Sequence, residues 1–205
     1  MRKEILNPDQ TELLPLLRAF ARDYYLAGGT AIALYLGHRR SIDFDLFTTG
    51  GIKKQSIKKT IDNHNRLVTD LLFEDSDQIH LVIDGVKVTF CSFPYDIEKS
   101  VTFEDYIDLP DLLTLAAMKA LALGGRAKWK DYVDLYFLLR DHFSLHQVSM
   151  RSKDLFGAFF NEKLFREQLC YFADIDYSEK IAFVAQPVPD SEIKQFLRDV
   201  ATTGF

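Results

Sequence analysis

The sequence has few cysteines and no surplus of positive charge. Its 205 residues include only two cysteines, Cys91 and Cys170, which lie far apart and form no C-x-x-C pair. This argues against a disulfide scaffold and against a thiolate zinc site. The 25 basic residues are outnumbered by 30 acidic ones, for a net charge of -5. That balance disfavours a generic basic protein that coats nucleic acid.

Membrane-directed segments are also missing. The stretch Met1–Gln10 is polar and has no apolar core of a signal peptide. The longest apolar helix that the sequence predicts, around Leu112–Leu123, contains Lys119 and is too short to cross a bilayer. We therefore expect a cytoplasmic protein that makes no membrane contact.

What the chain does contain is an ordinary globular composition with an aromatic bias. Apolar residues make up 47% and charged residues 27% of the sequence, which is typical of a folded domain. The length suits one domain, or a domain with a modest extension, whose core needs no disulfide or metal. The 17 phenylalanines and 9 tyrosines indicate an aromatic-rich core.

The hydrophobic pattern changes near residue 103. Before it, we predict helices at 8–20, 31–36 and 53–66 and strands at 24–27, 41–47, 67–73, 79–83 and 86–93. Asp84-Gly85 between the last two strands predicts a hairpin. After it, we predict only helices, at 110–123, 129–139, 151–172 and 190–200. We therefore expect an α+β fold, with a small mixed sheet and flanking helices in residues 1–103 and a helical region in residues 104–205 packed on it.

A glycine pair and a carboxylate pair are the residues most informative about chemistry. Gly28-Gly29 falls between a predicted strand and a predicted helix, where backbone amides can approach an anion such as phosphate. Asp43 and Asp45 are two residues apart on a predicted strand, so their side chains leave the same face. That spacing suits oxygen ligation of Mg²⁺ or Mn²⁺, which also takes waters and triphosphate oxygens as ligands.

This ordered combination resembles the signature of the DNA polymerase β-like nucleotidyltransferase superfamily. The longer run Tyr25–Phe47 is similar, more particularly, to the AbiEii/AbiGii toxin-type nucleotidyltransferases. Lys119, Arg126 and the run from Lys130 to Asp134 resemble the later signature of that family. The resemblance covers residues from about 10 to 143.

The resemblance implies a fold, an activity and partners. The fold is the nucleotidyltransferase fold, and the activity is metal-dependent transfer of a nucleoside monophosphate from an NTP to an acceptor hydroxyl. The implied acceptor is an RNA such as tRNA, or a protein. The implied role is that of the toxin in a bacterial toxin–antitoxin or abortive-infection system, with an antitoxin as partner.

The resemblance also implies roles for individual residues. The glycine pair would hold the triphosphate, Thr30 would add a hydroxyl contact, and the two strand carboxylates would bind the metal. Nucleotide binding is implied for Gly28, Gly29, Thr30, Lys119, Arg126 and Lys130. Catalysis is implied for Asp43, Asp45, Lys119 and Asp131.

One position departs from the superfamily pattern, which places a third carboxylate on the neighbouring strand. Alternation puts Lys87, Thr89 and Cys91 on one face of that strand, with Thr89 in the expected slot. Threonine is neither a carboxylate base nor a strong metal ligand. Two functions therefore stay open: an active nucleotidyltransferase, or a catalytically weakened nucleotide-binding pseudoenzyme or partner-binding module.

Ordinary structural explanations exist for several of these side chains. The strand carboxylates are also consistent with exposed alternates of an edge strand. Lys130 and Asp134 have the i, i+4 spacing of a helix-surface ion pair. Arg126 follows a predicted helix, where a cation commonly stabilises the helix end. A basic stripe of Lys53, Lys54, Lys58 and Lys59 is more typical of a solvated helix face than of an RNA contact.

Overall fold

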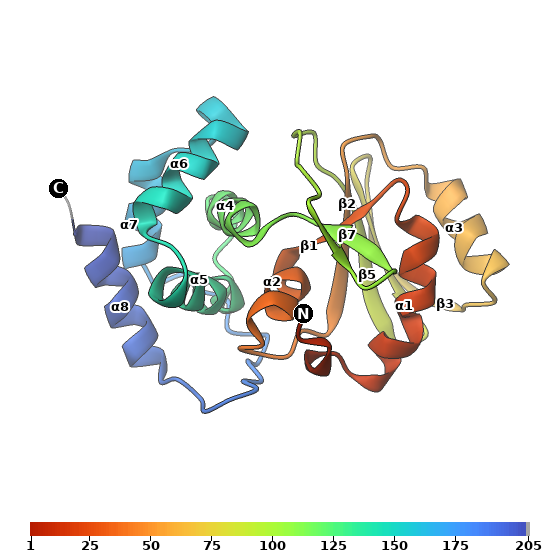
Figure 1. Ribbon diagram of the computed structural model, residues 1–205, viewed down its shortest axis with the longest axis horizontal. Helices are drawn as coiled ribbons and strands as arrows, with labels where there is room; N and C mark the ends of the chain where they lie inside the picture. Colours follow the sequence, from red (N-terminus) through yellow and green to blue (C-terminus); the bar gives the residue numbers. More distant parts are fainter. Residues whose placement is uncertain (204–205) are drawn as a thin grey trace.

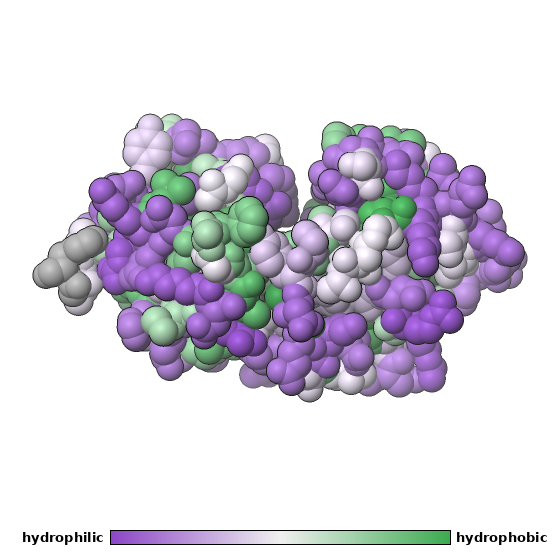
Figure 2. Space-filling view, turned by 90° about the horizontal axis from the view of Figure 1, so that it is seen from above, coloured by the Kyte–Doolittle hydropathy of each residue, from purple (hydrophilic) through white to green (hydrophobic). Residues whose placement is uncertain are grey.

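The computed structural model describes residues 1–203 and confirms the α+β class. In Figure 1 the sheet lies with α1 and α3 on one side of the molecule, and α4 to α8 gather on the other. Helix α2 lies between these two parts and contacts β1, β2, α4 and α5. Seen from above, the surface is notched between them (Figure 2).

The first part of the chain carries most of the predicted elements. Its helices are η1 (Lys3–Ile5), α1 (Pro8–Phe20), α2 (Gly28–Leu36) and α3 (Lys54–Asn63). Its strands are β1 (Tyr25–Ala27), β2 (Asp43–Thr48), β3 (Val68–Glu74), β4 (Gln78–Ile83) and β5 (Val86–Ser92). The strands form one mixed sheet in the order β1-β2-β5-β4-β3, in which only β2 and β5 run parallel.

Local sequence signals explain several of these boundaries. Asn7 caps α1 in a capping box with Gln10, each side chain accepting from the other residue's backbone N–H. Asp84 and Gly85 both adopt positive φ, 48° and 82°, which is the conformation of a tight hairpin turn. The predicted β4–β5 hairpin is therefore confirmed.

The later part of the chain is mostly helical, with a small hairpin at its start and a segment without helix or strand at residues 171–189. Its elements are β6 (Val101–Phe103), β7 (Ile107–Leu109), α4 (Leu112–Leu123), α5 (Trp129–Asp141), α6 (Leu145–Phe156), η2 (Gly157–Phe159), α7 (Glu162–Cys170) and α8 (Asp190–Thr202). The sequence pattern did not predict the three-residue strands, whose hairpin crosses the expected division after residue 103. Helix α4 begins at Leu112 rather than Pro110 because Asp111 caps it through the Thr114 N–H.

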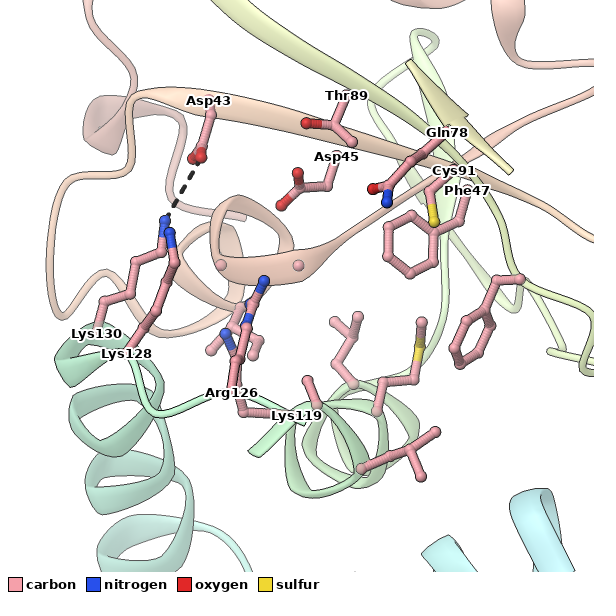
Figure 3. Close-up of a pocket in the computed structure, with 18 of the residues that line it drawn as sticks. Asp43, Asp45, Phe47, Gln78, Thr89, Cys91, Lys119, Arg126, Lys128 and Lys130 are labelled. Atoms are coloured by element: carbon pink, nitrogen blue, oxygen red, sulfur yellow. Dashed lines mark ion pairs between the residues drawn. The ribbon is translucent and has the colours of Figure 1, made fainter. Parts of the chain in front are cut away.

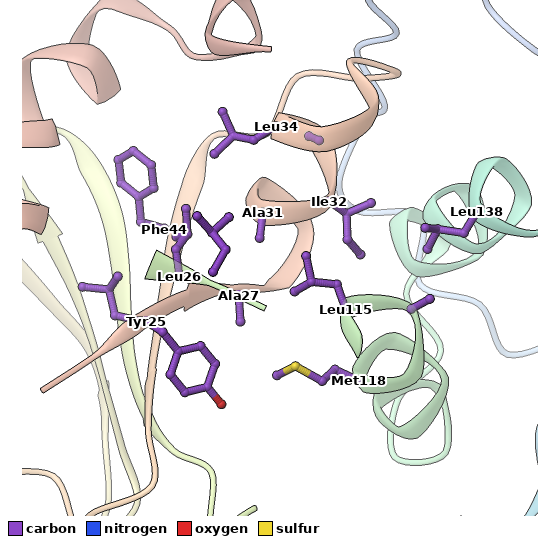
Figure 4. Packing of buried hydrophobic residues seen from close by; sticks show 14 of the residues in the cluster. Tyr25, Leu26, Ala27, Ala31, Ile32, Leu34, Phe44, Leu115, Met118 and Leu138 are labelled. Atoms are coloured by element: carbon purple, nitrogen blue, oxygen red, sulfur yellow. The ribbon is translucent and has the colours of Figure 1, made fainter. Parts of the chain in front are cut away.

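The core is continuous across both parts. Helix α2 is buried on almost every side, so Ala31 and Leu34 face the sheet while Ile32 lies toward Leu115 of α4 (Figure 4). Such a helix needs no amphipathic pattern because it is covered all round. One prediction about the strand pattern was wrong. Alternation along the predicted strand 41–47 places Ile42 on the same apolar face as Phe44 and Leu46, but Ile42 precedes β2 and is 68% exposed.

Candidate active site

A cavity of about 400 Å³ lies between one face of the sheet, the N-terminal ends of α2 and α5, and the middle and C-terminal part of α4. It is lined by Gly28, Gly29, Ile32, Asp43, Asp45, Phe47, Gln78, His80, Lys87, Thr89, Cys91, Phe93, Leu115, Met118, Lys119, Leu121, Ala122, Arg126, Lys128 and Lys130. Charged side chains gather at one end, and Phe47 and Cys91 lie at the other (Figure 3). The cavity is therefore polar and charged at one end and largely apolar at the other.

The glycine pair forms the first turn of α2, so the helix begins at Gly28 and not at Ala31 as the sequence predicted. Gly28 has a φ of 69°, in the left-handed region that favours glycine. A β-carbon there would also overlap the carboxylate of Asp45, and one on Gly29 would overlap the guanidinium of Arg39. Both glycines thus let charged side chains approach the start of the helix.

The two strand carboxylates project into the cavity from the same face of β2 (Figure 3). Asp43 is 8% exposed, and its Oδ2 lies 3.5 Å from the Lys130 ammonium. Burial, together with the charge of Asp43, raises the pKa of Asp45 from 3.8 to about 6. The positive groups nearby do not neutralise this pair fully.

Thr89 lies directly opposite Asp45 in the parallel β2–β5 ladder. Lys87, Thr89 and Cys91 all line the cavity, which confirms the predicted alternation along β5. The place of a third carboxylate is therefore held by a hydroxyl. Burial raises the pKa of the nearby Cys91 thiol to about 11, so this thiol is no activated nucleophile.

Thr30 does not line the cavity. Its side chain is fully buried, and its hydroxyl donates a hydrogen bond to the main-chain carbonyl of Asp43. The direct ligand contact predicted for this hydroxyl is therefore not available. The bond instead joins the first turn of α2 to the start of β2.

A buried network of charges backs the cavity on the helical side. The Lys119 ammonium, 4% exposed, lies 2.7 Å from Asp131 Oδ1 and 3.0 Å from Asp134 Oδ2. Arg39 donates to both oxygens of Asp134 at 2.7 and 2.9 Å, and His38 Nε2 lies 2.8 Å from the first of them. Although burial opposes it, Arg39 and Lys119 hold the pKa of Asp134 well below its usual range.

Asp131 belongs to this network and not to the cavity wall. It is fully buried and accepts hydrogen bonds from Lys119 and from Arg126, whose Nε lies 2.9 Å from Oδ2. Burial opposes ionisation here as well, yet these two cations lower the pKa of Asp131. Arg126 does line the cavity, with 49% of its side chain exposed.

Lys130 lines the cavity from the first turn of α5, together with Lys128 just before that helix. The helix-surface ion pair that the i, i+4 spacing of Lys130 and Asp134 allows does not form, because Asp134 is fully buried and pairs with Arg39 and Lys119. Lys130 instead contacts Asp43 and Glu179, the latter at 2.5 Å.

A family model described as nucleotidyl transferase AbiEii toxin, type IV TA system, matches residues 16–203. The chain belongs to the AbiEii nucleotidyltransferase toxin family. This confirms the resemblance that the glycine pair, the strand carboxylates and the α5 motif carry. The match also extends through the last 60 residues, where the sequence suggested no resemblance.

The chain is also similar to individual proteins, in sequence or in fold. An uncharacterized protein of Aquifex aeolicus is 35% identical over 150 residues, which cover 69% of this chain and 70% of that protein. JHP933 from Helicobacter pylori shares the fold with a TM-score of 0.59 at 16% identity, over 94% of this chain and 88% of the other. MenT4, a nucleotidyltransferase toxin of Mycobacterium tuberculosis, also has a TM-score of 0.59, at 13% identity over 94% and 81%.

Three site residues of this AbiEii-family chain were not predicted: Arg39, Lys128 and Glu179. Arg39 adjoins the loop before β2. It is buried against Asp134, which is too distant in the sequence for a local pattern to indicate the pairing. Glu179 lies in a segment without regular structure, so no periodic pattern marked it. Among residues 1–203, no helix is long and apolar enough to cross a membrane.

Proposed function

We propose that this AbiEii-family chain transfers a nucleoside monophosphate from an NTP to an acceptor hydroxyl and releases pyrophosphate. The observation that carries the proposal is the meeting of the Gly28-Gly29 turn with Asp43 and Asp45 in one cavity. Backbone amides at a helix start favour phosphate oxygens, and paired carboxylates favour a divalent cation. Together they fit a metal-bound triphosphate.

The donor set supports Mg²⁺ or Mn²⁺ held by Asp43 and Asp45. The raised pKa of Asp45 marks excess negative charge, which a cation would relieve. Within residues 1–203 no group of three His, Cys, Asp or Glu side chains is placed to hold a metal. Water and triphosphate oxygens would therefore complete the coordination. When bound, such an ion stabilises negative charge that develops on the oxygens around phosphorus.

The polarity of the cavity supports one orientation of the nucleotide. Its phosphates would lie at the charged end, near Gly28, Arg126 and Lys130, and its base at the end lined by Phe47 and Phe93. Aromatic side chains provide a flat apolar surface on which a base can stack. A cavity of about 400 Å³ is within the usual size of small-molecule sites.

Thr30, predicted to contact the nucleotide, and Asp131, predicted to act in catalysis, are better described as positioning residues. Thr30 would hold Asp43 through its main-chain carbonyl. Asp131 would hold Lys119 and Arg126, which themselves line the cavity. Lys119 would act on the phosphates while its charge is balanced from behind by Asp131 and Asp134.

The toxin role, the acceptor and the antitoxin remain parts of this proposal. The description of the family supports a toxin of a type IV toxin–antitoxin system. The acceptor would be an RNA such as tRNA, or a protein, and an antitoxin would counteract the chain in the same cell.

Label transfer tests the proposal. Purified protein is incubated with each α-labelled NTP, Mg²⁺ or Mn²⁺, and total tRNA or cell lysate. We expect label on an acceptor with wild type and none with Asp43→Ala/Asp45→Ala. Asp70→Ala, an exposed carboxylate of the same sheet, is the matched control and should retain activity. Equal labelling by wild type and the double variant would contradict the metal-site assignment.

Thr89 favours a second candidate, a nucleotide-binding pseudoenzyme. Thr89→Asp would restore a carboxylate opposite Asp45. A large gain in transfer, from a wild type that binds NTP but labels nothing, would identify a chain that has lost catalysis. No change from an already active wild type would mean that Asp43 and Asp45 suffice.

A further inference from the structure

The segment between α7 and α8, residues 171–189, forms a strap beside the candidate active site. It has no helix or strand of its own, but two isolated bridges hold it: one pairs Lys128 with Asp176, the other Arg39 with Phe183. The first anchor adjoins the start of α5 and the second adjoins the loop before β2. The strap therefore runs between the start of α5 and the loop before β2.

Residues 177–181 arch between these anchors and carry Glu179 to the cavity lysines. Glu179 Oε1 accepts from the Lys128 ammonium at 2.8 Å, and Oε2 from the Lys130 ammonium at 2.5 Å. Burial opposes ionisation of Glu179, but the two lysines lower its pKa to about 2. It is thus an ionised carboxylate at neutral pH, with one oxygen on each ammonium.

This arrangement has the chemistry of a bound phosphate group. Lysine ammonium groups bind carboxylate and phosphate oxygens through the same charge-assisted hydrogen bonds. Lys128 and Lys130 both line the cavity, and Lys130 also lies 3.5 Å from Asp43. An anionic ligand that enters the cavity meets these two ammonium groups with a carboxylate already on them.

We propose that Glu179 is an internal competitor that occupies Lys128 and Lys130 until a phosphate group of the triphosphate displaces it. The inference rests on the proposed function, because it takes the triphosphate of an NTP as the ligand of these lysines. Lys128 then joins the phosphate-binding residues. A segment of the C-terminal region sets the affinity of the site, since binding is weakened by the fraction of molecules in which the lysines are occupied.

Calorimetric titration of the full chain with inorganic triphosphate, in a chelator at moderate salt, tests this. Glu179→Gln keeps the shape of the side chain and removes its charge, so we expect the Kd to fall about 3- to 10-fold, at most about 1.4 kcal/mol. Glu179→Ala should act in the same direction. Asp174→Asn removes the same charge from an exposed residue of the same strap and is the matched control, with a change below about twofold.

A third variant locates the effect on the lysines. Lys128→Gln added to Glu179→Gln should reverse most of the gain. Circular dichroism and thermal unfolding check that each variant is folded. An unchanged or higher Kd for folded Glu179→Gln and Glu179→Ala would overturn the proposal and make Glu179 a group that holds the lysines in place. Absence of binding by wild type and both variants would overturn it too.

The outcomes separate this inference from the proposed function. Label transfer by wild type, with an unchanged Kd in Glu179→Gln, overturns only the role of Glu179. Tighter triphosphate binding by Glu179→Gln, without label transfer by any variant, supports that role and counts against the proposed activity.

Discussion

Two pairs of aspartates lie in and behind the site, and their surroundings differ in kind. Asp43 and Asp45 lie on a strand and project into the cavity, and the pKa of Asp45 is raised to about 6. Asp131 and Asp134 lie on a helix, are fully buried, and have lowered pKa values. The helix pair is surrounded by cations of the fold itself, whereas the strand pair is left short of positive charge. Identical side chains thus serve as internal counter-charges behind the cavity and as candidate ligands within it.

The largest effect that tests this comparison is on stability. Asp134 pairs with both Arg39 and Lys119, so Asp134→Asn would leave Arg39 buried without this carboxylate and Lys119 with Asp131 alone. Breaking a buried charge pair costs about 3–5 kcal/mol. We expect that loss in the free energy of unfolding, measured by urea denaturation. Asp154→Asn, an exposed change on α6, is the control, and a loss below about 1 kcal/mol for Asp134→Asn would contradict the counter-charge role.

The second effect concerns pH. The pKa of Asp45 is raised from 3.8 to about 6 in the folded protein. Protonation of Asp45 therefore contributes stability that is fully present below about pH 4 and is lost as the pH rises through 6. Asp45→Asn stays neutral, so its unfolding free energy minus that of wild type should rise between pH 4 and 7, by up to about 3 kcal/mol. Urea denaturation in a chelator measures this difference. Asp70→Asn controls for the charge change.

The helix pair has the opposite sign. Asp131 and Asp134 have lowered pKa values, so their contribution is present above about pH 4 and lost as the pH falls through their folded values. If the unfolding free energy of Asp45→Asn minus that of wild type stayed constant from about pH 4 to 7, the raised pKa of Asp45 would be contradicted. The contrast in pKa between the strand pair and the helix pair would then be lost.

The smallest effect comes from the edge of the buried network. Arg126 donates to Asp131, but 49% of its side chain is exposed and solvent screens the pair. Arg126→Gln should therefore lower the free energy of unfolding by only about 1 kcal/mol. Because Arg126 lines the cavity, the variant should also bind inorganic triphosphate more weakly, several-fold by calorimetry. A loss as large as that of Asp134→Asn would show that exposure does not weaken this contact.

Sequence patterns predicted the local parts of the site best. The glycine pair, the two strand carboxylates and the slot of Thr89 lie within short stretches whose alternation and turn signals fix their faces. Tertiary pairing decides the rest. Arg39 and Asp134 are 95 residues apart, and Glu179 lies 49 residues after Lys130. No periodicity links positions so distant along the chain.

The errors in the predicted elements have local causes. The β6–β7 hairpin has strands of three residues, too short for an alternation to be recognised. Ile42 follows the alternation of β2 but precedes its first ladder pair, so pairing does not fix its direction. Thr30 was predicted to contact the nucleotide because it follows the glycine pair. Its hydroxyl instead donates a hydrogen bond to the main-chain carbonyl of Asp43 inside the fold.

The separation between Arg39 and Asp134 has a consequence for the newly made protein. Ribosomes add about 5–20 residues per second, so the 95 positions between the two partners take roughly 5–20 s to synthesise. For most of that time the Gly28-Gly29 turn and both strand carboxylates have already been made, but the guanidinium of Arg39 still lacks its partner Asp134. A nascent or prematurely terminated chain therefore carries the motif without the completed site. Under the proposed function, the order of synthesis itself would delay nucleotide transfer until the helical half has been added.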